Sequence, residues 1–204
     1  MKALLSTEPG PPETLKLTEV DNPEPDLGEL LIRVKAAAIN YPDVLIIEDK
    51  YQLKPPRPFA PGGEISGEIE KVGEGVEGWA PGDRIIAVTG YGGLAEKMVI
   101  PARAAFRLPA GRSFAEGSAL LLTYATSIHA LADRGRIEAG QTLLVLGAAG
   151  GVGLAAVELG KAYGARVIAA VSSAEKAAAA REAGAPGGRQ RTVTFGRLAD
   201  AGCE

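Results

Sequence analysis

A glycine-rich turn constrains the fold of this chain more than any other feature. The segment LGAAGGVG, residues 146–153, lies between an apolar run and a stretch with helical spacing. Its glycines recur at every third position, as Gly147, Gly150 and Gly153. The first lets the chain turn tightly off a strand, and the third lets a helix pack closely against that strand. The pattern therefore predicts a strand–turn–helix unit of a parallel α/β sheet.

The elements around this turn repeat the alternation of strand and helix. The predicted strands are the apolar runs Thr142–Leu146 and Arg166–Val171. The predicted helices are Val152–Tyr163, closed by Gly164, and Ala174–Ala183, capped by Ser172 or Ser173 and closed by Gly184. Continuous apolar strands that alternate with helices are typical of a parallel sheet covered on both faces. Thr192–Phe195 could add a short third strand.

In this setting the glycine turn predicts a dinucleotide site. The second glycine lets the backbone approach a pyrophosphate, which would lie on free N–H groups at the positive end of the following helix. The alternative is a glycine-rich turn that binds no ligand. The candidate cofactor-binding residues in the turn are Gly147, Gly150, Gly151, Val152 and Gly153.

The end of the second strand indicates which dinucleotide is bound. An NAD site usually carries an Asp or Glu there, which binds the ribose 2′-hydroxyl. No acid stands at the end of Arg166–Val171, and Ser172, Ser173 and Lys176 could hold a 2′-phosphate instead. We therefore expect NADPH as the cofactor. In the alternative interpretation, Ser173 is only a helix cap and Lys176 only a surface charge.

The first 110 residues have a different texture and predict a β-rich module. Short runs rich in Val, Ile and Leu are separated by Pro- and Gly-rich turns, which is typical of a barrel or sandwich. Ser113 to Glu116 forms a capping box, which predicts the start of a helix, and a second helix is expected from about Tyr124 to Asp133. The predicted strands are Met1–Leu5, Leu15–Val20, Glu29–Ala37, Glu64–Val72, Asp83–Val88 and Ala95–Ile100.

Composition excludes several classes of function. The net charge of −3 gives no electrostatic reason to expect nucleic acid or an anionic membrane as partner. A single cysteine, Cys203, and a single histidine, His129, exclude an intrachain disulfide and a zinc site built from several Cys and His ligands. The beginning of the chain is too polar for a signal peptide, and no membrane span is expected, so we expect a soluble, cytoplasmic protein.

Six stretches together carry a resemblance to a known family. They are Ala36–Asp43, Pro61–Gly67, Val72–Val76, Pro81–Arg84, Thr123–Ala130 and Gly147–Gly153. With them the chain resembles the medium-chain dehydrogenase/reductase superfamily, in its zinc-free NADPH:quinone oxidoreductase branch. The resemblance implies α/β plus β architecture: a GroES-like β-barrel over residues 1–122, then the first half of a Rossmann domain over 123–185.

The resemblance implies a hydride transfer from NADPH to a quinone or another α,β-unsaturated carbonyl, and such enzymes are often homodimers. Zinc alcohol dehydrogenases carry a cysteine where Asn40 stands and a histidine where Gly63 stands, so no metal is expected. Two alternatives stay open. One is an enoyl thioester reductase of the same superfamily, and the other is a non-catalytic fragment that binds NADPH.

Four catalytic candidates are carried over from the resemblance. Asn40 and Asp43 match an Asn-x-x-Asp pattern where substrate and nicotinamide meet, although Asp43 can equally hold local backbone. Tyr51 matches a proton-donating tyrosine of enoyl thioester reductases, or else forms a wall of the substrate site. Thr126 matches a threonine that faces the nicotinamide amide. His129 is expected on a packed helix face rather than in catalysis.

The last residues depart from the family pattern. A doubly wound dinucleotide fold has about six strands, and this sequence supplies the first two and at most part of a third. We therefore expect a C-terminally truncated member of the family with an atypical tail over residues 186–204. An out-of-frame reading of a G+C-rich gene would produce such a tail, and the alternative is a natural short form or a fragment that pairs with a second chain. Weak cofactor binding and little turnover are expected of these residues alone.

Overall fold

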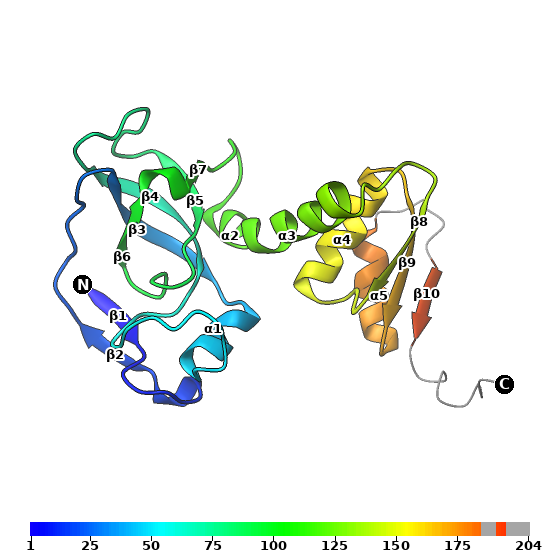
Figure 1. Cartoon of the computed structure of the whole chain (residues 1–204), viewed down its shortest axis with the longest axis horizontal. Helices are drawn as coiled ribbons and strands as arrows, with labels where there is room; N and C mark the ends of the chain where they lie inside the picture. Colours follow the sequence, from blue (N-terminus) through cyan, green and yellow to red (C-terminus); the bar gives the residue numbers. More distant parts are fainter. Residues whose placement is uncertain (185–190, 195–204) are drawn as a thin grey trace. The chain divides into compact units, whose positions relative to one another are not determined.

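The computed structural model describes residues 1–184 and, by its backbone, the segment 191–194. The chain divides into two compact units, residues 1–121 and 122–204 (Figure 1). None of the helices in the described ranges has the length and apolar content that crossing a membrane requires. The rest of the predicted tail, and Phe195 of the predicted third strand, lie outside the described residues.

The first unit is built on a five-stranded antiparallel sheet with the strand order β6-β3-β4-β5-β7. Beside it, β1 and β2 form an antiparallel ribbon, and a bridge between Ala3 and Ala95 joins this ribbon to the segment before β6. The β-rich prediction is confirmed, and only β7 was missed. The strands are β1 (Lys2–Leu5), β2 (Lys16–Glu19), β3 (Glu29–Ala38), β4 (Glu64–Val72), β5 (Arg84–Val88), β6 (Lys97–Pro101) and β7 (Ala105–Arg107).

Large aliphatic side chains of the central strands fill the core of this unit. Leu30, Ile32, Ile65 and Ile85 are fully buried, and the burial of such side chains is the main force that holds a sheet of this kind together. Short helices surround the sheet, and α2 packs against β3, β4 and β5. These helices are η1 (Pro12–Thr14), α1 (Tyr41–Ile47), η2 (Ala102–Ala104) and α2 (Phe114–Ser118).

The predicted capping box begins α2. Ser113 Oγ accepts a hydrogen bond from the backbone N–H of Glu116 at 3.2 Å, and the Glu116 carboxylate accepts one from the backbone N–H of Ser113 at 2.8 Å. The Glu116 carboxylate accepts hydrogen bonds from the Ser113 backbone N–H, from the Ser113 hydroxyl and from Arg112, and these bonds, in that order, lower the pKa of Glu116 from 4.5 to about 2. Helix α1 was not predicted from the sequence, because its seven residues are too few to show a clear helical period.

The second unit contains a parallel sheet with the strand order β10-β9-β8. The elements β8 (Thr142–Leu146), β9 (Arg166–Val171) and α5 (Ala174–Ala183) have the predicted bounds, and α4 (Gly151–Ala162) is shifted by one residue. β10 (Arg191–Thr194) pairs in parallel with β9 and supplies the third strand. The predicted helix before β8 is one helical run with π-helical segments, made of η3 (Leu121–Ala125), α3 (Thr126–Ile128) and η4 (His129–Arg134).

Helices α4 and α5 pack on one face of this sheet (Figure 1). Val157 of α4 and Ala177 of α5 share a core there with Val145 and Val167 of the strands. Leu144 and Leu146 of β8 do not belong to this core. In the described part of the chain they are 56% and 66% exposed.

Candidate cofactor and substrate site

The turn between β8 and α4 has the geometry that its glycines predict. Gly147 has φ +65°, a conformation in which a side chain would be strained. A Cβ atom on Gly153 would lie 2.4 Å from the carbonyl oxygen of Gly147 and 2.8 Å from Cα of Ala148. At Gly150 the nearest atom to such a Cβ atom would be 3.6 Å away, so space is open there. Gly147 and Gly153 are therefore required by the backbone geometry of the turn, while Gly150 leaves an open surface before the helix.

A pocket of about 320 Å³ lies between this turn and the end of β9. The two segments are joined by a hydrogen bond from the backbone N–H of Ala148 to the carbonyl oxygen of Ala170, at 3.2 Å. Four of the predicted cofactor residues therefore lie around one pocket. Its lining residues are Gly147, Ala149, Gly150, Ala170, Val171, Ser172 and Lys176.

The polar end of the pocket is formed by Ser172 and Lys176. Lys176 Nζ donates a hydrogen bond to Ser172 Oγ at 3.0 Å, and both residues are exposed. Ser173 has a different place: its Oγ accepts the backbone N–H of Lys176 at 3.2 Å and caps α5. This geometry supports the interpretation of Ser173 as a helix cap. It leaves a hydroxyl and an ammonium group at the pocket.

The remaining turn residues lie in the first turn of α4, against the helical run that precedes β8. Ser127 Oγ donates to the carbonyl oxygen of Val152 at 3.0 Å, and a Cβ atom on Gly151 would lie 3.1 Å from Cγ2 of Thr123. Thr126 is exposed, and its hydroxyl donates to the carbonyl oxygen of Leu122 at 2.5 Å, within its own helix. The run therefore fixes the start of α4 in place.

A second contact between this helical run and α4 involves Tyr124. Its hydroxyl donates to the carboxylate of Glu158 on α4. This hydrogen bond, with partial burial, raises the pKa of Tyr124 to about 12, so the phenol stays protonated at neutral pH.

His129, which we expected on a packed face, is exposed instead, and that expectation was wrong. Its Nδ1 lies 2.8 Å from Asp133 Oδ2, four residues further along the same helical run. The buried Ser127 of this run contacts α4.

In the first unit, the carboxylate of Asp43 accepts hydrogen bonds from backbone N–H groups. Its Oδ2 accepts the backbone N–H of Asn40 at 2.7 Å, and its Oδ1 accepts those of Gly62 and Gly63 at 3.1 and 3.0 Å. The side chain is buried, so these donors replace the water that would solvate the carboxylate. The arrangement supports the structural reading of Asp43: it ties the start of α1 to the segment before β4.

Asn40 is the N-cap of α1, and its side chain meets a residue that sequence reasoning missed. Asn40 Nδ2 donates to Oε2 of Glu64 at 3.1 Å, and Glu64 is only 1% exposed. The available signal in the sequence was an acid at the head of the apolar strand Glu64–Ile69. Buried carboxylates are uncommon, and they need hydrogen-bond donors when they occur.

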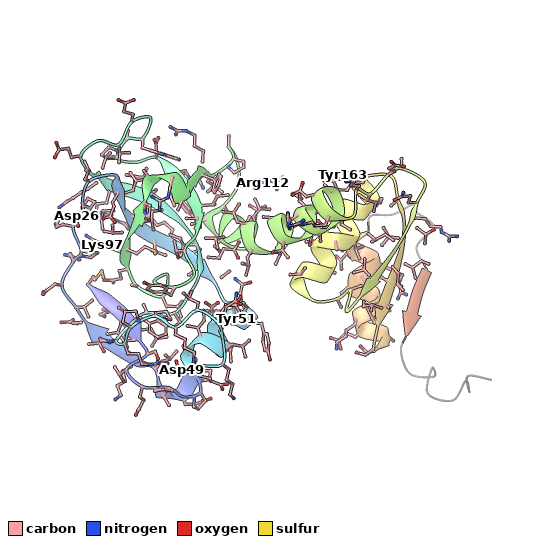
Figure 2. All side chains as sticks on the ribbon, in the orientation of Figure 1. Asp26, Asp49, Tyr51, Lys97, Arg112 and Tyr163 are labelled. Carbon is pink, nitrogen blue, oxygen red and sulfur yellow. The ribbon has the colours of Figure 1, made fainter. Side chains whose placement is uncertain are left out.

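Tyr51 follows α1 and is partly buried. Figure 2 labels Tyr51 next to α1. Tyr51 packs against a small apolar cluster of Ile46, Ile47 and Phe59. This contact supports its reading as a wall residue, since the ring is held by packing. Asn40, Asp43 and Tyr51 belong to the first unit, and Thr126 belongs to the second.

Gly63 stands in a crowded place. A Cβ atom there would lie 3.0 Å from the carbonyl carbon and oxygen of Gly90. A side chain at this position would require the backbone of the neighbouring loop to move. Within the described ranges, no group of three or more His, Cys, Asp or Glu side chains could hold a metal ion.

The first unit is β-rich, and in it Asp43 is hydrogen-bonded to the backbone of Asn40. The second unit is a parallel α/β unit with a glycine turn after its first strand. This combination is typical of the class of dinucleotide-binding dehydrogenases and reductases. Residues 26–110 match the family of the alcohol dehydrogenase GroES-like domain.

Curated relatives with similar sequences include proteins named quinone oxidoreductase and quinone oxidoreductase-like protein 2. The chain is 38% identical over 177 residues to the quinone oxidoreductase of Rattus norvegicus, across 86% of this chain and 54% of that protein. It is 41% identical over 160 residues to a quinone oxidoreductase-like protein 2 homolog of Nematostella vectensis, across 78% and 44%. The chain thus spans about half the length of the curated relatives it matches.

Solved structures agree with this assignment. A probable oxidoreductase from Mycobacterium abscessus superposes with a TM-score of 0.89 at 36% identity, covering 97% of this chain and 62% of that one. The Escherichia coli quinone oxidoreductase complexed with NADPH superposes with a TM-score of 0.87 at 32% identity, covering 96% and 59%. The chain belongs to the quinone oxidoreductase branch of the medium-chain dehydrogenase/reductase superfamily, as its resemblance implied.

Proposed function

We propose that this protein is an NADPH-dependent, zinc-independent oxidoreductase that reduces quinones or other α,β-unsaturated carbonyls. The observation that carries the proposal is the pocket that Gly147 and Gly150 share with Ser172 and Lys176. The names of its relatives support the reaction, and the NADPH complex of the Escherichia coli protein supports the cofactor.

The residues present fit the cofactor. Gly150 leaves open space where a pyrophosphate would approach, and the backbone N–H groups of Gly151, Val152 and Gly153 begin α4 beside it. A helix N-terminus of this kind stabilises negative charge through its free N–H groups and its dipole. When it is bound, NADPH supplies the hydride.

The choice of NADPH over NADH rests on the end of β9. The ammonium of Lys176 and the hydroxyl of Ser172 match a phosphate in charge and in hydrogen-bonding capacity. Among the described residues that line the pocket, none has a carboxylate that could bind a free ribose 2′-hydroxyl. A dianionic 2′-phosphate therefore gains contacts here that NADH does not.

On the substrate side, the amide of Asn40 binds a carbonyl oxygen, and Tyr51 forms a wall of the site. For Thr126 we propose the role that the family resemblance implies, contact with the nicotinamide amide. Zinc independence rests on Asn40 and Gly63, which stand where the zinc alcohol dehydrogenases have ligands. An amide is a poor zinc ligand, and a side chain at Gly63 would require the Gly90 backbone, 3.0 Å from its Cβ atom, to shift.

The test is a fluorescence titration of the purified chain with NADPH and NADH in parallel, followed by a quinone reduction assay. Lys176→Met should weaken NADPH binding about tenfold or more and leave NADH binding unchanged. Arg181→Met is the matched control, since it removes an exposed cation from α5 outside the pocket. Equal affinity for both dinucleotides would contradict the NADPH assignment. Binding without turnover would support the non-catalytic alternative, and reduction of crotonyl thioesters but not quinones would support the enoyl thioester alternative.

A further inference from the structure

We propose that Glu64 is a positioning residue for the reduction reaction, because it orients the side-chain amide of Asn40 toward the substrate. This inference rests on the proposed function and adds to it a residue that contacts neither cofactor nor substrate. Its basis is the hydrogen bond from Asn40 Nδ2 to Glu64 Oε2, at 3.1 Å, between residues 24 positions apart.

The sheet places the two residues together. Ala38, near the end of β3, is the register partner of Glu64 at the head of β4, so Asn40 leaves the sheet beside this carboxylate. Glu64 is held on its other side by pairing with Val88 of β5. Its backbone is therefore fixed between two strands and its side chain is buried, which makes it a rigid support.

Two carboxylates hold Asn40, each at a different atom. Asp43 Oδ2 accepts the backbone N–H of Asn40, and Glu64 Oε2 accepts the side-chain N–H. Asp43 also holds Gly62 and Gly63, the residues just before Glu64. The backbone and the amide of Asn40 are thus anchored to the same stretch of chain.

The bond to Glu64 decides which way the Asn40 amide faces. Glu64 Oε2 accepts this hydrogen bond, and an acceptor oxygen pairs with the amide nitrogen rather than with the amide oxygen. The backbone carbonyl oxygen of Asn40 accepts the N–H of Asp43 at 3.0 Å, which fixes the backbone at the start of α1. The bond to Glu64 therefore favours one of the two flipped orientations of the amide. Since an amide nitrogen has two N–H groups, the second is available to a substrate oxygen.

The residues on either side of Asn40 are large, apolar and exposed. Ile39 and Tyr41, on either side of it, are 65% and 74% exposed. Large apolar side chains around a few oriented polar groups are typical of small-molecule sites. A fixed N–H donor between them suits the carbonyl oxygen of a flat, apolar substrate.

The first test is steady-state reduction of a quinone by NADPH with Glu64→Leu and Glu64→Gln. Loss of the support lets the amide rotate, so E64L should lower kcat/KM for the quinone by about 10- to 100-fold. E64Q retains an acceptor oxygen and nearly the same volume, so it should keep more of the activity and guards against misfolding. The KM for NADPH should not change. Glu68→Gln is the matched control on the same strand, where the carboxylate forms an exposed ion pair with Lys35 at 3.1 Å.

A double variant separates positioning from general damage. If Glu64 acts through Asn40, Asn40→Ala combined with E64L should lose no more kcat/KM than N40A alone. Additive losses, or an E64L variant as active as the unmodified chain, would overturn the positioning role while leaving the proposed function intact.

A second measurement does not depend on turnover. The chain has two asparagines, Asn22 and Asn40, so their side-chain amide signals in a ¹⁵N–¹H NMR spectrum can be compared directly. E64L should move the Asn40 amide signals and leave those of Asn22 in place. If the unmodified chain reduces no quinone, the proposed function fails. In that case shifted Asn40 signals would still support the orienting bond, and unmoved signals would overturn it as well.

Discussion

A Cβ atom on Gly153 would lie 2.4 Å from the carbonyl oxygen of Gly147, closer than any real Cβ contact. Gly153→Ala should therefore push α4 away from β8 and lower the free energy of unfolding by about 1–3 kcal/mol. Chemical denaturation followed by circular dichroism measures this loss.

Gly150→Ala provides the comparison at the same turn. Its nearest neighbour would be 3.6 Å from the new methyl group, and its φ of −83° suits any residue. We expect this variant to fold with nearly unchanged stability but to bind NADPH more weakly, because the methyl group occupies the surface where a phosphate would approach. A G153A variant as stable as the unmodified chain would contradict the close packing.

Asp43→Ala should destabilise the first unit strongly. It removes the acceptors of three backbone N–H groups, those of Asn40, Gly62 and Gly63, in a buried place. The expected loss is about 3 kcal/mol, and Asp43→Asn should lose less because it keeps one acceptor oxygen. Thermal unfolding measures it. Asp133→Ala, at an exposed carboxylate, should change stability by less than about 0.5 kcal/mol, and an equally small effect of D43A would contradict the bracing role.

Ionisation of Glu116 makes the folding stability of the chain depend on pH under acidic conditions. Its pKa of about 2 in the folded chain lies below the ordinary value of 4.5, so folding favours the ionised form. This contribution is fully present above about pH 4.5 and is lost as the pH falls toward 2. The stability difference between the unmodified chain and Glu116→Gln should shrink over this range, as measured by denaturation at a series of pH values. Ser113→Ala should reduce the same pH dependence, and a difference that stays constant with pH would argue against the capping box as its cause.

Chelation of metals should not affect quinone reduction. Activity measured before and after treatment with EDTA should agree within error. The double variant Asn40→Cys, Gly63→His restores the ligand types of zinc alcohol dehydrogenases, yet it should bind no stoichiometric zinc, because the Gly90 backbone lies 3.0 Å from a Cβ atom at position 63. Atomic absorption after dialysis measures this, and one tightly bound zinc per chain would refute it.

Much of the second unit was predictable because its signals are local. The bounds of Thr142–Leu146, Arg166–Val171 and Ala174–Ala183 follow from continuous apolar runs, a serine cap and closing glycines, each read within a few residues. The glycine turn is likewise a local device, and its conformational requirements at Gly147 and Gly153 could be stated in advance. The same holds for the strands of the first unit, where turns punctuate short β-rich runs.

The tertiary structure decided which polar groups meet. The Asn40–Glu64 bond depends on the pairing of β3 with β4, and the three donors of Asp43 come from two segments about twenty residues apart. Ser173 became a cap while Ser172 turned to Lys176, although both serines follow the same strand. Whether a segment forms a helix or a strand depends mainly on steric and hydrogen-bonding constraints between residues that are close in the sequence. The partner of a buried polar atom is set by register and packing, which a local pattern does not contain.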